Sequence, residues 1–291
     1  MTETEEFLLL IICPLSSVIS PPTAMRLRIA HSIVRHYDPP AASAIQVLRL
    51  TPRNHEGQYV IDWRIDVSAD ARLVAHEDAF GNFTHVFTAD GPLEELSVNV
   101  DGAVETQDTG GLIRDAVERF PPSLFLRDTS LTRADRAIRD FAQQVRAASD
   151  GEASAELHAL LRGLRDEIAP ASVPSEPAAT APEVFARKRG GAQDSTHVFI
   201  GAARSLGIPA RYVAGYFCAG GGATPQSDYA WAEAFVPDVG WVGFDPAKGA
   251  CPTDAYVRVA VGLDALGAAL MRGKRYGAGD ETLKIAVKMD Q

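Results

Sequence analysis

The fold is decided first by residues 190–216, GGAQDSTHVFIGAARSLGIPARYVAGY. After two glycines, apolar residues recur at the spacing of an amphipathic helix as far as Leu206. Gly207 and Pro209 then end the helix, because glycine suits the residue just beyond a helix end and proline cannot continue a helix. Residues 210–216 are mostly apolar, which is typical of a buried strand. The stretch therefore predicts a helix followed directly by a strand.

The flanking segments extend this pattern on both sides. Residues 229–247, YAWAEAFVPDVGWVGFDPA, predict two strands joined by a turn at Pro237–Gly240. Upstream, residues 132–148 and 157–168 each carry one apolar face with helical spacing. The second half of the chain is therefore expected to pack helices against an antiparallel sheet. Connecting loops are expected at the proline-rich residues 170–182 and the glycine-rich residues 218–227.

The first half of the chain has a different period. From Met25 to about Thr106, apolar residues alternate with polar ones, and clusters of turn residues interrupt the runs. Several short strands at this spacing favour an antiparallel β-sandwich. Two of the turns are predicted at Tyr37–Pro40 and Asp90–Pro92. The expected strands are residues 27–36, 45–50, 59–67, 73–76, 84–88 and 96–104.

Residues 1–24 are expected to lie outside the folded domains. The apolar run FLLLII at residues 7–12 is much shorter than the roughly 20 residues of a membrane-spanning helix. It follows three acidic residues and no lysine or arginine, whereas a secretory signal has a positive segment there. We expect the native protein to begin at Met25, with residues 1–24 an upstream translation or a flexible tail, and we expect no export.

The composition is that of an ordinary globular protein. The 291 residues are 46% hydrophobic and 23% charged, which excludes collagen-like, disordered and disulfide-scaffold classes, and the length favours two domains. The formal net charge is -10 and no basic run is longer than Arg187–Arg189, so nucleic-acid binding is disfavoured. Three widely spaced cysteines favour neither a disulfide framework nor a cysteine zinc site, and they suit the reducing cytoplasm.

Five separated segments of the second half resemble the bacterial transglutaminase-like family, a branch of the papain-like cysteine enzymes. The first half is similar to the β-rich domain that precedes the core in these proteins, through LRLTP at residues 48–52 and DAFGNFTHV at residues 78–86. The resemblance implies an α+β fold, with a β-sandwich-like domain at residues 25–108 and a papain-like core at residues 109–291. The five segments are GAQDSTH (191–197), RSLGIPARYVAGY (204–216), YAWAEAF (229–235), GWVGFDPA (240–247) and YVRVAVG (256–262).

The resemblance implies a catalytic set of three residues, of which this chain keeps one. The family's chemistry uses a cysteine at a helix N-terminus, a histidine base on the next strand and an aspartate that orients the histidine. Ala192, in GGAQD, stands where the resemblance places the cysteine, and Tyr229, in YAW, stands where it places the histidine. Asp245, in FDP, matches the third position. We expect Asp245 to accept a hydrogen bond from the Tyr229 hydroxyl.

Residues near Ala192 are poor substitutes for the missing pair. Ser195 and Thr196 lie about one helical turn too deep to replace the nucleophile. His197, the last histidine of the chain, points about 140° away from Ala192 and is expected to face the sheet or the neighbouring domain. Asp194 lies in the first turn of the helix, where a capping role is expected.

The other candidate residues of the second half are expected to be structural. Cys218 and Cys251 begin no predicted helix, so nothing visible lowers a thiol pKa, and both are expected to be small apolar or loop residues. Trp231, Trp241 and Phe244 lie among small residues on predicted strands and are expected in the core.

The leading function hypothesis is a catalytically inactive transglutaminase-like protein that binds a peptide or protein partner. The resemblance adds that bacterial members often accompany ATP-dependent peptide-ligase-like proteins, so such an enzyme or an active relative is the expected partner. The alternative is an active cysteine-type peptidase, amidase or acyl transferase with unrecognised residues, and a third hypothesis makes the second half a structural module. No metal or organic cofactor is implied, neither nucleic acid nor membrane is expected as a partner, and the expected location is the cytoplasm.

Overall fold

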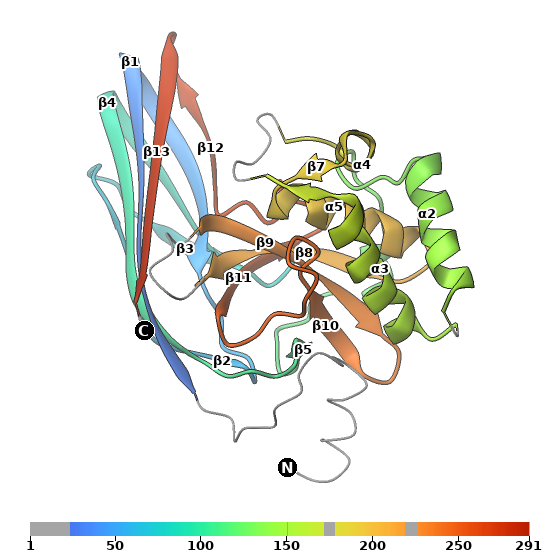
Figure 1. Cartoon of the computed structure of the whole chain (residues 1–291). Coiled ribbons are helices and arrows are strands. Elements are labelled where there is room, and N and C mark those ends of the chain that lie inside the picture. The colour runs from blue at the N-terminus through green and yellow to red at the C-terminus, as the bar shows by residue number, and fades with distance from the viewer. Residues whose placement is uncertain (1–23, 150, 172–177, 219–225, 291) are drawn as a thin grey trace.

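The computed structural model describes residues 24–149, 151–171, 178–218 and 226–290 of the chain. In these ranges the chain forms two larger antiparallel sheets and four α-helices, and Figure 1 shows the second sheet between the first sheet and the helices. This is the α+β arrangement that the sequence predicts. No helix in these ranges is both long enough and apolar enough to cross a membrane. Residues 1–23 of the expected tail and the central parts of both expected loops lie outside the described residues.

The first sheet is built on two long strands. β1 (Met25–Thr51) and β4 (Phe83–Thr106) pair along nearly their whole lengths. Leu27, Ile29 and Ile33 on β1 point to the core, as the period of two predicts. The other strands of this sheet are β2 (Gln58–Val67) and β3 (Val74–Glu77), which pair with β4, and β12 (Met271–Tyr276) and β13 (Asp280–Asp290), which pair with β1.

Two of the predicted turns are wrong, because they lie inside continuous strands. Tyr37–Pro40 falls within β1 and Asp90–Pro92 within β4, at a place where the pairing register shifts. Pro39 has no partner on β4, so its missing N–H removes no hydrogen bond from that ladder. A β-carbon on Gly91 would lie 2.2 Å from the Ala41 carbonyl oxygen, so glycine permits this close approach of the strands. The sheet bends here and folds back on itself (Figure 1).

The second sheet carries the segments that decided the fold. Its strand order is β11-β8-β9-β10-β5, and α5 (Ala192–Ser205) packs against β8 and β9. The predicted order of helix, strand and hairpin is thus confirmed. The strands are β5 (Leu112–Ile113), β8 (Ala210–Phe217), β9 (Gln226–Val236), β10 (Gly240–Phe244) and β11 (Tyr256–Gly262). The remaining elements are η1 (Pro122–Leu126), α2 (Arg136–Ala147), α3 (Ala153–Glu167), α4 (Ala181–Arg187) and the short strands β6 (Ala169–Pro170) and β7 (Arg189–Gly190).

The C-terminal strands β12 and β13 belong to the first sheet and not to the second. β12 pairs with residues 43–48 of β1, and β13 pairs with residues 28–38 of the same strand. Val287 on β13 lies opposite His31 and is buried. The physical reason is that β1 would otherwise be an edge strand with an open row of hydrogen-bonding groups over a buried face. The first sheet is therefore completed by the end of the chain.

Candidate functional site

Helix α5 begins at Ala192, the predicted position of the lost nucleophile. Gly191 before it is in an extended conformation. The Gly191 N–H donates to Asp194 Oδ2 at 3.1 Å, and Arg187 Nη2 donates to the same oxygen at 3.0 Å. These contacts confirm the predicted capping role of Asp194, and they hold the first turn of the helix in place.

Tyr229 and Asp245 meet through their side chains. Tyr229 lies on β9, and Asp245 directly follows β10, the strand that pairs with β9. The Tyr229 hydroxyl donates to Asp245 Oδ2 at 2.7 Å, which confirms the predicted hydrogen bond. Asp245 Oδ1 accepts the backbone N–H groups of Ala247 and Lys248 at 3.0 and 3.1 Å. The carboxylate is thereby tied both to the sheet and to the turn that follows it.

A second tyrosine shares this carboxylate, and sequence reasoning missed it. Tyr256 begins β11, and its hydroxyl donates to Asp245 Oδ2 at 2.8 Å. Its strand was one of the segments that carry the family resemblance, but a strand pattern does not pair a tyrosine with an aspartate beyond a neighbouring strand. With two donors on each oxygen, the four acceptor positions of the Asp245 carboxylate are filled.

Burial sets the protonation state of this group. Burial raises the pKa of Asp245 above its ordinary value, and the hydrogen bonds from Tyr229 and Tyr256 counteract that rise. Burial and the Asp245 charge together raise the pKa of both tyrosines well above their ordinary value of 10.0. The two phenols therefore stay protonated at neutral pH and donate to the carboxylate. A phenol held in that state is not a general base.

Ala192 lies beside a cluster of aromatic rings. Ala192 is partly buried and packs against a cluster that includes Tyr229, Trp231 and Tyr256. The centroid of the Tyr256 ring lies 6.0 Å from that of Tyr229 and 5.4 Å from that of Trp231. The exposed fractions of Tyr229, Trp231 and Tyr256 are 5%, 2% and 7%. The three rings therefore offer little surface to a ligand and form a small core of their own.

The neighbouring polar residues of α5 are held in structural contacts. The Thr196 hydroxyl donates to the helix carbonyl four residues earlier at 2.7 Å. His197 Nε2 accepts the Ala265 N–H at 3.1 Å, and its ring centroid lies 5.2 Å from that of Tyr212 on β8. This confirms that His197 faces the sheet. Burial lowers the pKa of His197 to about 4, so the ring is neutral at physiological pH.

Cys218 and Cys251 lie in connecting segments, away from any helix N-terminus. Cys218 follows β8 and is partly exposed, while Cys251 follows β10 and is buried. Neither forms a disulfide in the described part of the chain. Trp241 and Phe244 are buried together with Trp231, which confirms the expected core role of all three. Within the described ranges, no group of three or more histidine, cysteine, aspartate or glutamate side chains could hold a metal ion.

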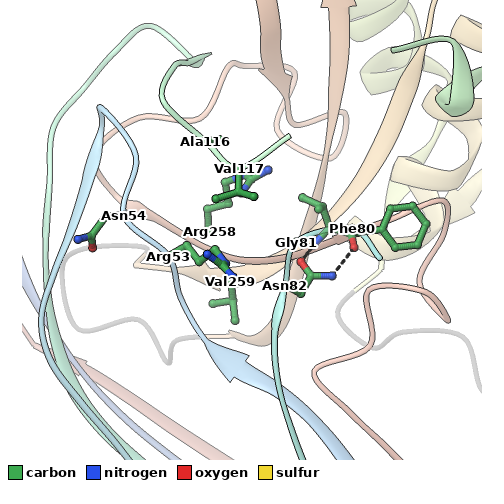
Figure 2. Close-up of a pocket in the computed structure, with 10 residues that line it drawn as sticks. Arg53, Asn54, Phe80, Gly81, Asn82, Ala116, Val117, Arg258 and Val259 are labelled. Carbon is green, nitrogen blue, oxygen red and sulfur yellow. Dashed lines mark hydrogen bonds between the residues drawn. The ribbon is translucent and has the colours of Figure 1, made fainter. Parts of the chain in front are cut away.

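A separate small pocket lies between the two sheets. Figure 2 shows Arg53, Gly81 and Asn82 from the N-terminal half together with Arg258 and Val259 from β11. Its volume is about 10 Å³, which is space for about one water molecule. The pocket includes none of the three predicted site residues, so it is not an extension of that site.

Comparisons with known proteins agree with this arrangement. Residues 27–105 match the bacterial transglutaminase-like N-terminal region, and residues 139–246 match the transglutaminase-like superfamily. An uncharacterized protein of Mycobacterium leprae is 27% identical over 279 residues, covering 91% of this chain and 98% of that protein. The crystal structure of a candidate cysteine protease from Cytophaga hutchinsonii matches with a TM-score of 0.73 at 19% identity, covering 92% of this chain and 91% of that one.

The two family matches occur in the order that the sequence predicts. The first covers most of the bent sheet, and the second includes Ala192, Tyr229 and Asp245. The structural match extends the shared fold over nearly the whole chain. Residues 27–105 therefore carry the bacterial transglutaminase-like N-terminal region, and residues 139–246 that follow carry a match to the transglutaminase-like superfamily.

Proposed function

We propose that this protein is a non-catalytic member of the superfamily that acts by binding a peptide or protein partner. The observation that carries the proposal is the state of Asp245. Its carboxylate is filled by two tyrosine hydroxyls and two backbone N–H groups, whereas the family's chemistry needs it to orient an imidazole. Asp245 here acts as a structural acceptor.

The chemistry of the other two positions supports the same proposal. A methyl group stands at Ala192, where acyl transfer needs a thiolate at the helix N-terminus. The Tyr229 phenol has a raised pKa, so it does not take a proton from a nucleophile at neutral pH. Turnover would therefore require a different nucleophile and a different base.

The alternative of an active cysteine enzyme receives little support. It would need Cys218 or Cys251 as the nucleophile. Cys251 is only 4% exposed, and neither thiol lies at a helix N-terminus that would lower its pKa.

The proposed partner is a peptide or protein, either an active relative or a peptide-ligase-like enzyme. The formal charge of -10 disfavours a polyanion such as nucleic acid. We also propose a cytoplasmic location, because the widely spaced cysteines suit a reducing compartment.

The test is a paired assay for peptide hydrolysis and amine incorporation. The natural chain is measured beside the double variant Ala192→Cys, Tyr229→His, with Ala192→Cys alone as the matched control that has a thiol but no base. We expect the natural chain and the control to be silent. Turnover by the double variant would show that the architecture of the site survives and only its chemistry is absent.

Turnover by the natural chain that disappears in Asp245→Ala would overturn the proposal. If all three chains are silent, the natural chain is still inactive. The packing of buried aromatic rings against Ala192 would then also prevent turnover in the double variant.

A further inference from the structure

The strand that carries Tyr256 is at the edge of the second sheet. β11 pairs with β8 on one side, and its other side faces the N-terminal half of the chain. The pairing with β8 is interrupted by a register shift between Arg258 and Ala260. An edge strand with such an irregularity has backbone groups that its own sheet leaves unpaired. In this protein, side chains from the first sheet bind several of those groups.

Gln58 binds β11 at two points. Its Nε2 donates to the Arg258 carbonyl at 2.9 Å, and its Oε1 accepts the Arg258 N–H at 2.7 Å. The same Nε2 also donates to the Arg53 carbonyl at 2.8 Å, which ties the amide to its own half of the chain. Gln58 is 4% exposed, so water does not compete for these hydrogen bonds.

Asn82 repeats this arrangement three residues further along β11. Its Nδ2 donates to the Val261 carbonyl at 2.8 Å, and its Oδ1 accepts the Val261 N–H at 2.8 Å. The Asp78 carboxylate accepts a second hydrogen bond from Nδ2 at 3.0 Å and so fixes the orientation of the amide. Asn82 is as deeply buried as Gln58.

A third side chain holds the residue just before the strand. The Thr106 hydroxyl donates to the Asp254 carbonyl at 2.6 Å, two residues before Tyr256. Thr106 is fully buried at the end of β4, where its backbone pairs with Gln58 on β2. Tyr256 therefore lies between two anchored points of the chain, Asp254 and Arg258.

We propose that the first sheet and the turn before β4 position the candidate site, through Gln58, Asn82 and Thr106. These side chains set the path of residues 254–261 and thereby the position from which the Tyr256 hydroxyl reaches Asp245. None of the three touches Ala192, Tyr229 or Asp245 in any of these hydrogen bonds. The proposal goes beyond the proposed function, because it concerns the placement of Tyr256 whether or not the site is catalytic.

The test is hydrogen exchange on the full chain, with near-isosteric variants that remove only the polar contact. The variants are Gln58→Met, Asn82→Leu and Thr106→Val, and Thr106→Ser is the rescue variant because it keeps the hydroxyl. His31→Phe is the matched control. The His31 imidazole bonds the Tyr216 hydroxyl on β8 at 3.0 Å, so the control breaks a buried hydrogen bond between the sheets in which no atom of β11 takes part.

We expect exchange of the backbone N–H groups in residues 254–262 to rise about tenfold or more in the three variants, while the rest of the core sheet changes less. The Tyr256 Cζ resonance, assigned with Tyr256→Phe, should shift in Thr106→Val and return in Thr106→Ser. The control should leave both readouts near those of the natural chain.

Two results would overturn the proposal. One is a uniform rise of exchange across the second sheet, matched by the control, which would mean that the three side chains only add general stability. The other is an unchanged Tyr256 resonance in Thr106→Val. Because Thr106→Val removes one hydroxyl group without a change of shape, the comparison with Thr106→Ser stays decisive even if the amide variants fold poorly.

Discussion

At the scale of single residues, Asp245 is the group on which the site depends. It is fully buried, yet it receives two phenol and two backbone donors, so the cost of burying a carboxylate is offset by hydrogen bonds. The same four donors leave it no free acceptor position for an imidazole. One aspartate can thus keep its place in a family motif while its role changes from orienting a base to joining β9, β11 and the turn after β10.

Replacement of Asp245 is expected to destabilise the protein strongly. Asp245→Ala leaves the hydroxyls of Tyr229 and Tyr256 and two backbone N–H groups without their acceptor. We expect a loss of about 2–4 kcal/mol in the free energy of unfolding, measured by urea denaturation. Asp70→Ala, at an exposed position, is the control and should change it by less than about 0.5 kcal/mol. A loss below about 1 kcal/mol for Asp245→Ala would contradict the structural role.

The two tyrosines predict a loss of stability at high pH. Their folded-state pKa values lie above the unfolded value of 10.0, so folding favours the protonated phenols. Their contribution is complete below about pH 10 and is lost as the pH rises further, because the unfolded chain then releases protons that the folded chain keeps. The free energy of unfolding should fall above that pH, and tyrosinate absorbance should follow it. Tyr229→Phe, Tyr256→Phe should flatten this fall, and an equal slope in the double variant would refute the assignment.

At the scale of elements, the pairing of the C-terminal strand β13 with β1 could not be predicted from the order of the strands along the chain. β13 lies along β1 and covers an edge that would otherwise be open, and only its residue Val287 is fully turned into the core. The neighbouring residue Lys288 on the same strand points to solvent. Successive side chains of β13 therefore offer a test of the pairing in which the two substitutions are one residue apart.

A charge on the inner face of β13 is expected to disrupt the first sheet. Val287→Asp places a carboxylate opposite His31 among buried apolar side chains, and we expect it to cost at least about 3 kcal/mol of the free energy of unfolding. Lys288→Asp on the outer face should cost less than about 1 kcal/mol. Thermal and urea denaturation would measure both. Similar losses for the two variants would mean that β13 does not pair with β1 in this register.

At the scale of the whole molecule, the two sheets are joined by buried polar contacts as well as by apolar packing. His31 on β1 bonds Tyr216 on β8, and Gln58 and Asn82 bond the backbone of β11. The side chains of His31, Tyr216, Gln58 and Asn82 are buried, so separation of the sheets would leave donors and acceptors unsatisfied. We therefore expect the two sheets to unfold as one cooperative unit.

Buried histidines predict a loss of stability in acid. Burial lowers the pKa of His31 and His197 from 6.5 to about 4, so the folded chain binds fewer protons than the unfolded chain between these values. Stability is then lost as the pH falls from 6.5 toward 4, by up to roughly 3 kcal/mol for each histidine. His31→Phe, His197→Phe should flatten this dependence in urea denaturation, while His76→Gln at an exposed position serves as the control. A slope that is unchanged in the double variant would rule out these two residues as its source.

The sequence by itself determined the features that rest on local patterns. The change from a period of two to helical spacing separated the β-rich half from the helical core. The grouping of Ala192, Tyr229 and Asp245 into one site came from the family resemblance of the segments that carry them. The hydrogen bond between Tyr229 and Asp245 could also be predicted. Tyr229 lies on the first strand of a hairpin, and Asp245 directly follows the second strand.

Only the tertiary structure decided the features that join distant parts of the chain. Three such features depend on how strands lie beside one another. They are the bends of β1 and β4 at their prolines, the pairing of β13 with β1 and the hydrogen bond from the Tyr256 hydroxyl to Asp245. Gln58 and Arg258 are separated by 200 positions, and their contact leaves no mark on the periodicity of either segment. Periodicity states which face of an element is buried, whereas the partner of that face is chosen by the packing of the whole molecule.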